Sequence, residues 1–199
     1  MTLSSVYERK LIRQGFKLIA GVDEVGRGPL AGPLVAAAVV LPHKFSLPGL
    51  NDSKQLTPLA RERLCSRIKK IAVAVGLGSV DHKMIDRINV GQANFLAMKL
   101  AVEDLGLVPE YLLIDGGRHR IALKIAQVGI SGGDRKCASI AAASIVAKVA
   151  RDALMAEYHR KYPRYGFAQN MGYGTAAHLA ALAKYGPCAI HRRSFAPLA

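Results

Sequence analysis

The chain has 199 residues and a mass of 21.3 kDa, which fits one domain or one domain with a small extension. Hydrophobic residues make up 51% of it and charged residues 21%, which excludes a disordered or fibrous chain. Because 28 lysines and arginines face only 14 acidic residues, the net charge is +14, which favours a polyanionic partner such as nucleic acid or an anionic membrane surface.

The sequence argues against a membrane protein and against an exported one. The longest purely apolar run, residues 34–41, is much shorter than the ~20 residues of a membrane-spanning helix, and the first ten residues show no secretory signal. The three cysteines are odd in number and far apart in the chain, which argues against disulfides and a zinc knuckle. We therefore expect a cytoplasmic protein that binds no membrane, and as a separate expectation we take it to be a monomer.

Apolar periodicity and turn residues predict alternating strands and helices after an initial pair of strands. The first two strands are joined by a short link rich in glycine and proline, so we expect them to be antiparallel. The expected elements are strands at 18–22, 34–41, 72–78 and 111–114, a short helix capped by Asp81, and helices at 58–71, 92–105, 137–158 and 175–185. This order predicts an α/β domain with a mixed sheet over residues 1–156, and a helical, loop-rich extension over 157–199.

Four of the acidic residues do not look like ordinary surface charges. Asp23 and Glu24 directly follow the first predicted strand, Asp115 ends the strand at 111–114, and Asp134 precedes the long alanine-rich helix. Taken singly, each has a structural explanation: Asp115 precedes a glycine as in an ordinary turn, and Asp134 suits a helix N-terminus. If the strands of Asp23 and Asp115 are neighbours, however, these carboxylates meet at one edge of the sheet.

Such an acidic cluster needs either protonation or cations. Two unit charges about 4 Å apart repel by about 4 kcal/mol at an effective dielectric of 20. Oxygen ligands without clustered His or Cys suit Mg²⁺ or Mn²⁺, and two such ions ~3.5–4 Å apart form the usual apparatus for phosphodiester hydrolysis. On so basic a chain, the cluster favours a metal-dependent nuclease.

Candidate substrate contacts lie near the acidic residues. Gly26, Arg27 and Gly28 form a loop whose backbone N–H groups and guanidinium suit a phosphate, although a tight turn explains the glycines equally well. Lys54 lies in a loop and is either a phosphate contact or a solvated side chain. In the last forty residues, basic side chains alternate with tyrosines such as Tyr173, a pattern typical of nucleic-acid stacking but also of a basic surface over core tyrosines.

These residues together resemble bacterial ribonuclease HII, the type 2 ribonuclease H. The resemblance extends from Gly21 to about Pro197, and its motifs follow one another in the family's order. The matching stretches are residues 21–33, 52–54, 113–116, 133–134, 141–152, 172–175 and 191–195.

The resemblance implies a ribonuclease H-like mixed sheet flanked by helices, with a C-terminal helical extension. It implies an endonuclease that cuts the RNA strand of RNA–DNA hybrids and nicks DNA 5′ of embedded ribonucleotides, using two Mn²⁺ or Mg²⁺ ions. The roles that it implies are metal binding and catalysis for Asp23, Glu24, Asp115 and Asp134, and substrate binding for Gly26, Arg27, Gly28, Lys54 and Tyr173. Gly132 and Gly174 depart from the family, since many relatives have Lys and Pro there.

Two other functions stay open on the residues alone. A non-catalytic basic protein that binds nucleic acid would show salt-sensitive binding and no metal-dependent strand scission. Another nuclease of the same fold, such as a junction resolvase, would cleave all-DNA junctions without needing a ribonucleotide.

Overall fold

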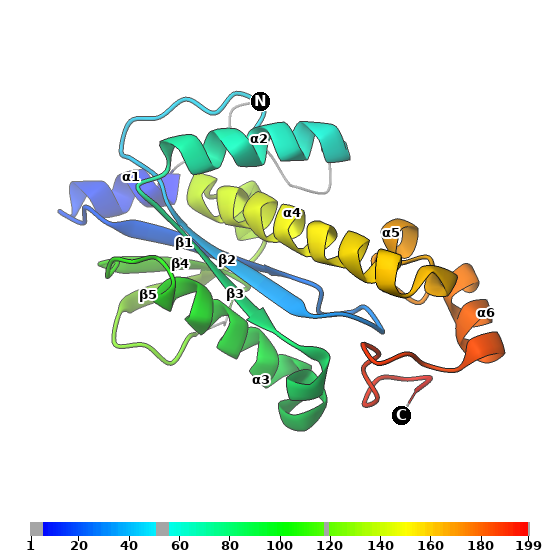
Figure 1. Cartoon of the computed structure of the whole chain (residues 1–199). Helices are drawn as coiled ribbons and strands as arrows, with labels where there is room; N and C mark the ends of the chain where they lie inside the picture. The colour runs from blue at the N-terminus through cyan, green and yellow to red at the C-terminus, as the bar shows by residue number, and fades with distance from the viewer. Residues whose placement is uncertain (1–5, 51–55, 118–119, 199) are drawn as a thin grey trace.

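The structure, a computed structural model, describes residues 6–50, 56–117 and 120–198. Its centre is a five-stranded sheet with the strand order β3-β2-β1-β4-β5 (Figure 1). β1 pairs with β2, and β2 with β3, in antiparallel fashion, whereas β4 is parallel to both β1 and β5. The strands are β1 (Ile19–Val25), β2 (Leu34–Val40), β3 (Ala74–Val80), β4 (Tyr111–Asp115) and β5 (Ala126–Ile130). The predicted mixed sheet is confirmed.

Helices cover both faces of this sheet. α3 packs on one face, and α2 and α4 pack on the other (Figure 1). The helical elements are α1 (Val6–Arg13), α2 (Pro58–Ile71), α3 (His82–Glu103), η2 (Gly133–Arg135), α4 (Ala138–Lys161), η3 (Pro163–Tyr165), α5 (Phe167–Asn170) and α6 (Ala176–Tyr185). No helix in the described ranges is long and apolar enough to cross a membrane.

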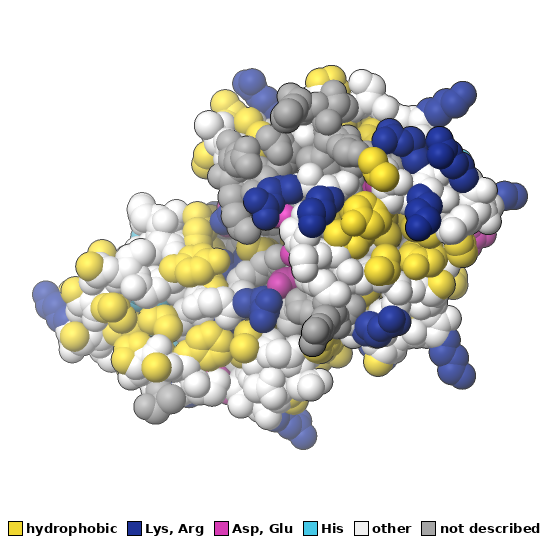
Figure 2. Space-filling view, turned by 180° about the vertical axis from the view of Figure 1, so that it is seen from behind, with side chains coloured by type: hydrophobic (Ala, Val, Ile, Leu, Met, Phe, Trp, Pro, Cys, Tyr) yellow, Lys and Arg dark blue, Asp and Glu magenta, His cyan; other side chains and the backbone are white. Residues whose placement is uncertain are grey.

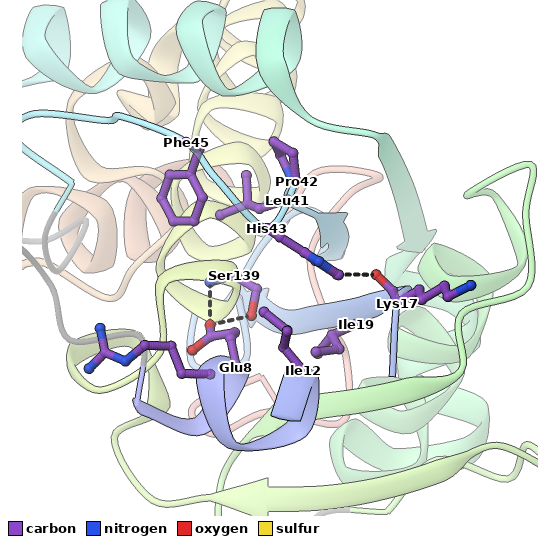
Figure 3. A pocket seen from close by; sticks show the side chains of 10 residues that line it. Glu8, Ile12, Lys17, Ile19, Leu41, Pro42, His43, Phe45 and Ser139 are labelled. Atoms are coloured by element: carbon purple, nitrogen blue, oxygen red, sulfur yellow. Dashed lines mark hydrogen bonds between the residues drawn. The ribbon is translucent and has the colours of Figure 1, made fainter. Parts of the chain in front are cut away.

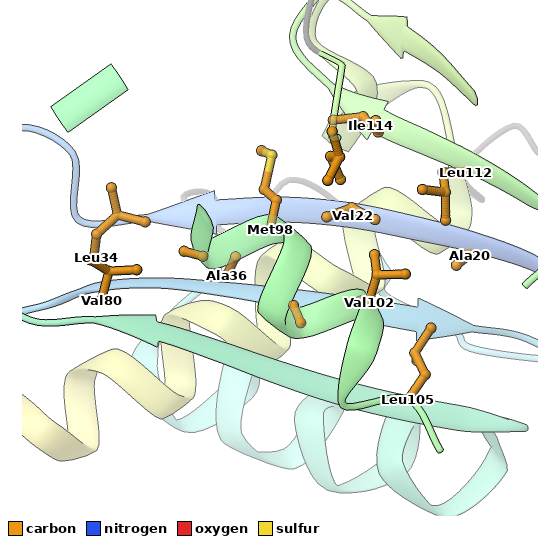
Figure 4. Close-up of a cluster of buried hydrophobic side chains, with 14 of the residues drawn as sticks. Ala20, Val22, Leu34, Ala36, Val80, Met98, Val102, Leu105, Leu112 and Ile114 are labelled. Carbon is orange, nitrogen blue, oxygen red and sulfur yellow. The ribbon is translucent and has the colours of Figure 1, made fainter. Parts of the chain in front are cut away.

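The core has one layer on each side of the sheet. Val22 of β1 and Ile114 of β4 pack with Met98 and Val102 of α3 in the larger layer (Figure 4). On the opposite face, alanines of β2 and α4 let the helix approach the sheet closely. The closest approach is at Gly21 of β1, where an added Cβ would lie 2.1 Å from the carbonyl carbon of Ser139. α4 is therefore held directly against the strand that carries Asp23.

Side-chain caps fix several helix ends where the sequence predicted them. Thr57 accepts a hydrogen bond from the amide of Ala60, Asp81 from Met84, and Thr175 from His178. The separate helices expected after Asp81 and at 92–105 form the single element α3, with a kink at Asn89 where φ is 65°. The Asn89 side chain caps the second part by accepting from the amide of Gln92 at 3.1 Å.

The remaining differences concern the ends and the C-terminal part of the chain. β1 continues to Val25, three residues beyond the predicted end, and neither α1 nor β5 was predicted. α4 runs without interruption past residue 157 to Lys161. Beyond it, η3, α5 and α6 surround a separate cluster of buried side chains that includes Met155 of α4 and Leu30. The division into residues 1–156 and 157–199 stays a prediction.

Candidate active site

Asp23 and Asp115 lie side by side at the ends of two parallel strands. Val22 of β1 is opposite Ile114 of β4, and both are buried against α3. Because successive side chains of a strand alternate between its faces, the next residues, Asp23 and Asp115, both point toward the face covered by α4. The prediction that these two carboxylates share one edge of the sheet agrees with this register.

The environment of Asp23 disfavours its charge. Its side chain is buried, with 6% of its surface exposed. Burial is the largest cause that holds its pKa well above the ordinary value, followed by the negative charges of Glu24 and Asp115. A hydrogen bond from Ser144 of α4 and one from the Glu24 amide, at 2.8 Å, act in the opposite direction. Glu24 and Asp115 are thus both close enough to Asp23 to affect it.

The short helix η2, which contains Asp134, begins next to Asp115. Gly132 adopts the left-handed conformation, with φ 61°, and starts the turn that leads into η2. The amide of Gly133 then donates a 2.6 Å hydrogen bond to Oδ1 of Asp115. Asp134, the next residue, is itself buried, with 8% exposed. The structure therefore brings the chain around Asp134 into direct contact with Asp115.

Glu24 and Arg27 connect the acidic residues to the glycine loop. Nη1 of Arg27 lies 3.4 Å from Oε1 of Glu24, and half of the Arg27 side chain is exposed. Gly26 has φ 92°, a conformation that other residues rarely adopt. Gly28 is exposed, and an added Cβ there would lie 3.7 Å from the ring of Tyr173. The loop and Tyr173 thus form one surface beside the carboxylates.

The acidic side chains fit a divalent cation in donor type and in charge. A buried carboxylate such as Asp23, whose pKa is raised by burial and by neighbouring carboxylates, is stabilised when a cation neutralises it, and hard oxygen donors suit Mg²⁺ and Mn²⁺. As the side chains stand, however, no group of three or more His, Cys, Asp or Glu in the described ranges could hold a metal ion.

The structure does not describe Lys54, and it places the polar residues of α4 in two different kinds of contact. Lys54 lies outside the residues that the structure describes. Lys148 and Asp152, a polar stripe on α4, form an ion pair with each other, and Asp152 also pairs with Arg61. Ser144, in the same stripe, contacts Asp23, a role that the sequence did not reveal.

The charge of the surface suits a polyanionic substrate. Lys and Arg side chains are numerous on the face shown in Figure 2, and few acidic side chains are visible between them.

A separate small cavity of about 40 Å³ lies between α1 and the start of α4 (Figure 3). There, Oε1 of Glu8 accepts hydrogen bonds from the amide and the hydroxyl of Ser139. Glu8 thereby caps the N-terminal end of α4. None of the predicted site residues lines this cavity.

Known proteins share both the sequence and the fold. The family model described as ribonuclease HII matches residues 20–198. Ribonuclease HII of Syntrophobacter fumaroxidans is 59% identical over 95% of this chain and 81% of its own length. The crystal structure of ribonuclease H2 from Pyrococcus horikoshii OT3 superposes with a TM-score of 0.77 at 28% identity, covering 91% of this chain and 95% of that one.

A more distant structure, Bst-RNase HIII in complex with Mn²⁺, is 21% identical and has a TM-score of 0.72, covering 92% of this chain and 68% of that one. It shares the fold. The predicted ribonuclease H-like architecture and the resemblance found in the motifs are thereby confirmed. The chain therefore belongs to the ribonuclease HII family and is a ribonuclease H, a nuclease of RNA–DNA hybrids.

Proposed function

We propose that this ribonuclease H also nicks DNA duplexes on the 5′ side of single embedded ribonucleotides, and that its reaction depends on two divalent cations, Mg²⁺ or Mn²⁺. The observation that carries the proposal is the pair of buried Asp23 and partly buried Asp115 at adjacent parallel strand ends, with Glu24 next to Asp23 and the Gly133–Asp134 segment in contact with Asp115. We further propose that the enzyme acts as a monomer in the cytoplasm.

In this proposal the four carboxylates hold the cations. Asp23 and Asp115 supply oxygens from the sheet, Asp134 from η2, and Glu24 from the next position of β1. When bound, the cations supply Lewis-acid activation of the attacking water and neutralise charge on the leaving oxygen. The Mn²⁺ complex of the ribonuclease HIII neighbour supports a divalent cation in this fold.

The glycine loop and Tyr173 supply selectivity for the ribonucleotide. The 2′-hydroxyl is the group that distinguishes RNA from DNA at a given position. Gly28 is exposed and has no side chain, so its backbone has room to approach the sugar and phosphates, while the exposed Arg27 guanidinium suits a phosphate. Gly26 is buried, and its φ of 92° shapes the turn that presents these two residues. The Tyr173 ring, 45% exposed and next to Gly28, is placed to pack on a sugar. Lys54 is proposed as a further phosphate contact.

The test uses a labelled DNA duplex with one ribonucleotide, incubated with Mg²⁺, Mn²⁺ or EDTA. The wild-type protein should cut 5′ of the ribonucleotide with either ion and not with EDTA. Asp23→Asn and Asp115→Asn should each reduce cleavage at least about a hundredfold, since even the loss of an outer-shell partner of a metal ligand costs 10–100-fold. Binding of the duplex should change little.

Glu103→Gln is the matched control, because Glu103 is an exposed carboxylate that pairs with Lys99 on the surface of α3. This variant should cleave at the wild-type rate. Full activity of Asp23→Asn or Asp115→Asn would contradict the proposed site. Cleavage of all-DNA junctions without a ribonucleotide would contradict the proposed substrate.

A further inference from the structure

Two fully buried arginines hold the loop that contains Gly26, Arg27 and Gly28. This loop connects the end of β1 at Val25 to the start of β2 at Leu34. Arg192 donates to three of its backbone carbonyls: Nε to Gly32 at 3.0 Å, Nη1 to Arg27 at 2.9 Å and Nη2 to Gly26 at 2.6 Å. Every nitrogen of this guanidinium therefore has a carbonyl partner in the loop.

Arg151 of α4 does the same for the other end of the loop. Its Nε donates to the carbonyl of Pro33 at 3.0 Å and its Nη2 to that of Ala31 at 3.2 Å. Its Nη1 donates at 2.9 Å to Met171, two residues before Tyr173. The amide of Leu30 also donates at 2.8 Å to the carbonyl of Gly172. Arg151 thus links the glycine loop to the segment that carries Tyr173.

Neither arginine has the partner that a buried charge usually needs. Both have 0% of their surface exposed, and neither forms an ion pair within the described ranges. Burial lowers the pKa of Arg192 to about 9, with the charge of Arg151 adding to the effect. A buried guanidinium costs free energy that its hydrogen bonds must offset. Here the bonds go to loop carbonyls, which would otherwise lack donors.

Lysine lacks the geometry for this arrangement. The guanidinium is a planar fork whose nitrogens point in fixed directions, so it bridges several carbonyls at once, whereas an ammonium is a single point charge. The fit is also close: an added Cβ on Gly26 would lie 2.3 Å from Nε of Arg151. The ring of Phe195 lies against the Arg192 guanidinium, with Cζ of Arg192 5.0 Å from the ring centroid. This contact helps to keep the guanidinium in place.

We propose that Arg192 and Arg151 are positioning residues for substrate recognition: they hold the backbone of residues 26–33 and the adjoining Tyr173 segment in the arrangement that meets the nucleic acid. This inference rests on the proposed function of the glycine loop. Asp23 and Asp115 are held by the pairing of β1 with β4, whereas the arginines bond to the backbone of residues 26–33, so the arginines affect how well substrate is bound more than the rate of the chemical step.

The test compares Arg192→Lys and Arg151→Lys with the wild type in steady-state cleavage. Two substrates are used, the DNA duplex with one ribonucleotide and an RNA–DNA hybrid of equal length. Each variant should raise KM at least about tenfold, while kcat changes less than about threefold, as expected for lost ground-state binding. Arg193→Lys is the matched control, because Arg193 is exposed and should keep the wild-type KM.

A double-mutant cycle distinguishes positioning from a general loss of stability. In an Arg27→Ala background, Arg192→Lys should raise KM by a clearly smaller factor than in the wild type, because the loop has already lost its guanidinium contact. If Arg192→Lys does not fold by circular dichroism, Phe195→Leu replaces it in the same cycle, since it removes the ring and keeps the guanidinium. Phe195→Leu should raise KM by less than the tenfold expected for Arg192→Lys. A still smaller increase for Phe195→Leu in the Arg27→Ala background would support the proposal.

Several outcomes overturn the inference. Wild-type KM values in Arg192→Lys and Arg151→Lys would do so, as would a loss of kcat at unchanged KM. The inference also fails if Arg192→Lys raises KM by the same factor in the wild-type and Arg27→Ala backgrounds. If the wild type cuts the hybrid and not the single-ribonucleotide duplex, the proposed function fails in that respect, and the arginine test is decided on the hybrid.

Discussion

The contact between β1 and the start of α4 leaves no room for a side chain at residue 21, and Gly21→Ala measures how much depends on it. A Cβ atom there would lie 2.1 Å from the carbonyl carbon of Ser139 and 2.3 Å from the amide nitrogen of Ile140. Both are backbone atoms of α4, so no side chain is able to rotate away. To bring that carbon pair to an ordinary contact distance, the strand and the helix would have to separate by roughly 1.5 Å.

The cost of that separation follows from overpacking data. Extra methyl groups in packed cores typically cost 1–3 kcal/mol, and a clash with rigid backbone on both sides belongs at the upper end, at about 3 kcal/mol. For a chain of this length, that free energy lowers the melting temperature by about 6–12 °C. Urea unfolding followed by circular dichroism should show a lower midpoint at an unchanged slope.

Gly91→Ala is the control for Gly21→Ala. Gly91 lies in α3, and the nearest atom to an added Cβ is the side-chain oxygen of Asn89 at 3.2 Å. Alanine favours a helix over glycine by up to about 1 kcal/mol, which offsets the small shift that the Asn89 side chain must make, so this variant should change stability much less than Gly21→Ala does. If Gly21→Ala unfolds at the wild-type urea concentration, α4 is free to shift against the sheet, and the argument for a rigidly placed Asp23 is refuted.

Three further predictions concern pH, a helix cap and metal binding. Burial and the neighbouring His178 lower the pKa of His191 to about 4, so the unfolded chain takes up a proton at this residue before the folded chain does as the pH falls below about 6.5. The free energy of unfolding, measured with urea, should therefore drop by about 2 kcal/mol between pH 7 and pH 5. The drop should be smaller in His191→Gln. Glu8→Ala removes the cap on Ser139 and should cost about 1–2 kcal/mol, whereas Glu62→Ala on the exposed face of α2 should not. Added Mn²⁺ should raise the melting temperature of the wild type and not of Asp115→Asn; equal shifts would place the ion elsewhere.

The features that the sequence predicted well are local ones. Thr57, Asp81 and Thr175 are followed by helices because each side chain caps an amide only three residues away. The approach of Asp23 to Asp115 was also predictable, since both follow short apolar strands and adjacent parallel strands bring such positions to one edge. In both cases the deciding interaction lies within the motif or in the rules of strand pairing.

The features that the sequence did not predict depend on distant partners. β1 was expected to end before the two acidic residues, yet Asp23 and Glu24 stay in the strand because they pair with Ala37 and Ala36 of β2. Asp23 is covered by α4, where Ser144 supplies a hydrogen bond. Nothing within the strand itself indicates this cover, so a charged residue there reads as the end of the strand.

The buried arginines were missed for the same reason. Arg192 lies in a basic stretch of the chain that is typical of a solvated surface, and its carbonyl partners are about 160 residues earlier in the sequence. Arg151 continues an apolar helix and has no local sign of its partners at Ala31 and Pro33. Burial of such side chains becomes visible only once the C-terminal segment is packed against the loop.

The buried charged residues of this molecule are of two kinds: acidic residues proposed to bind cations for the reaction, and arginines that hold the backbone of a loop in place. Asp23 lies among other carboxylates in a place where burial opposes its charge, so its surroundings favour the arrival of a cation. Arg192, by contrast, already has a backbone carbonyl at each guanidinium nitrogen and gains nothing from a further ligand. Changes at the carboxylates should therefore alter metal dependence and kcat, whereas changes at the arginines should alter the shape of the loop and KM. A variant of Arg192 with altered metal dependence and unchanged KM would show that this division is wrong.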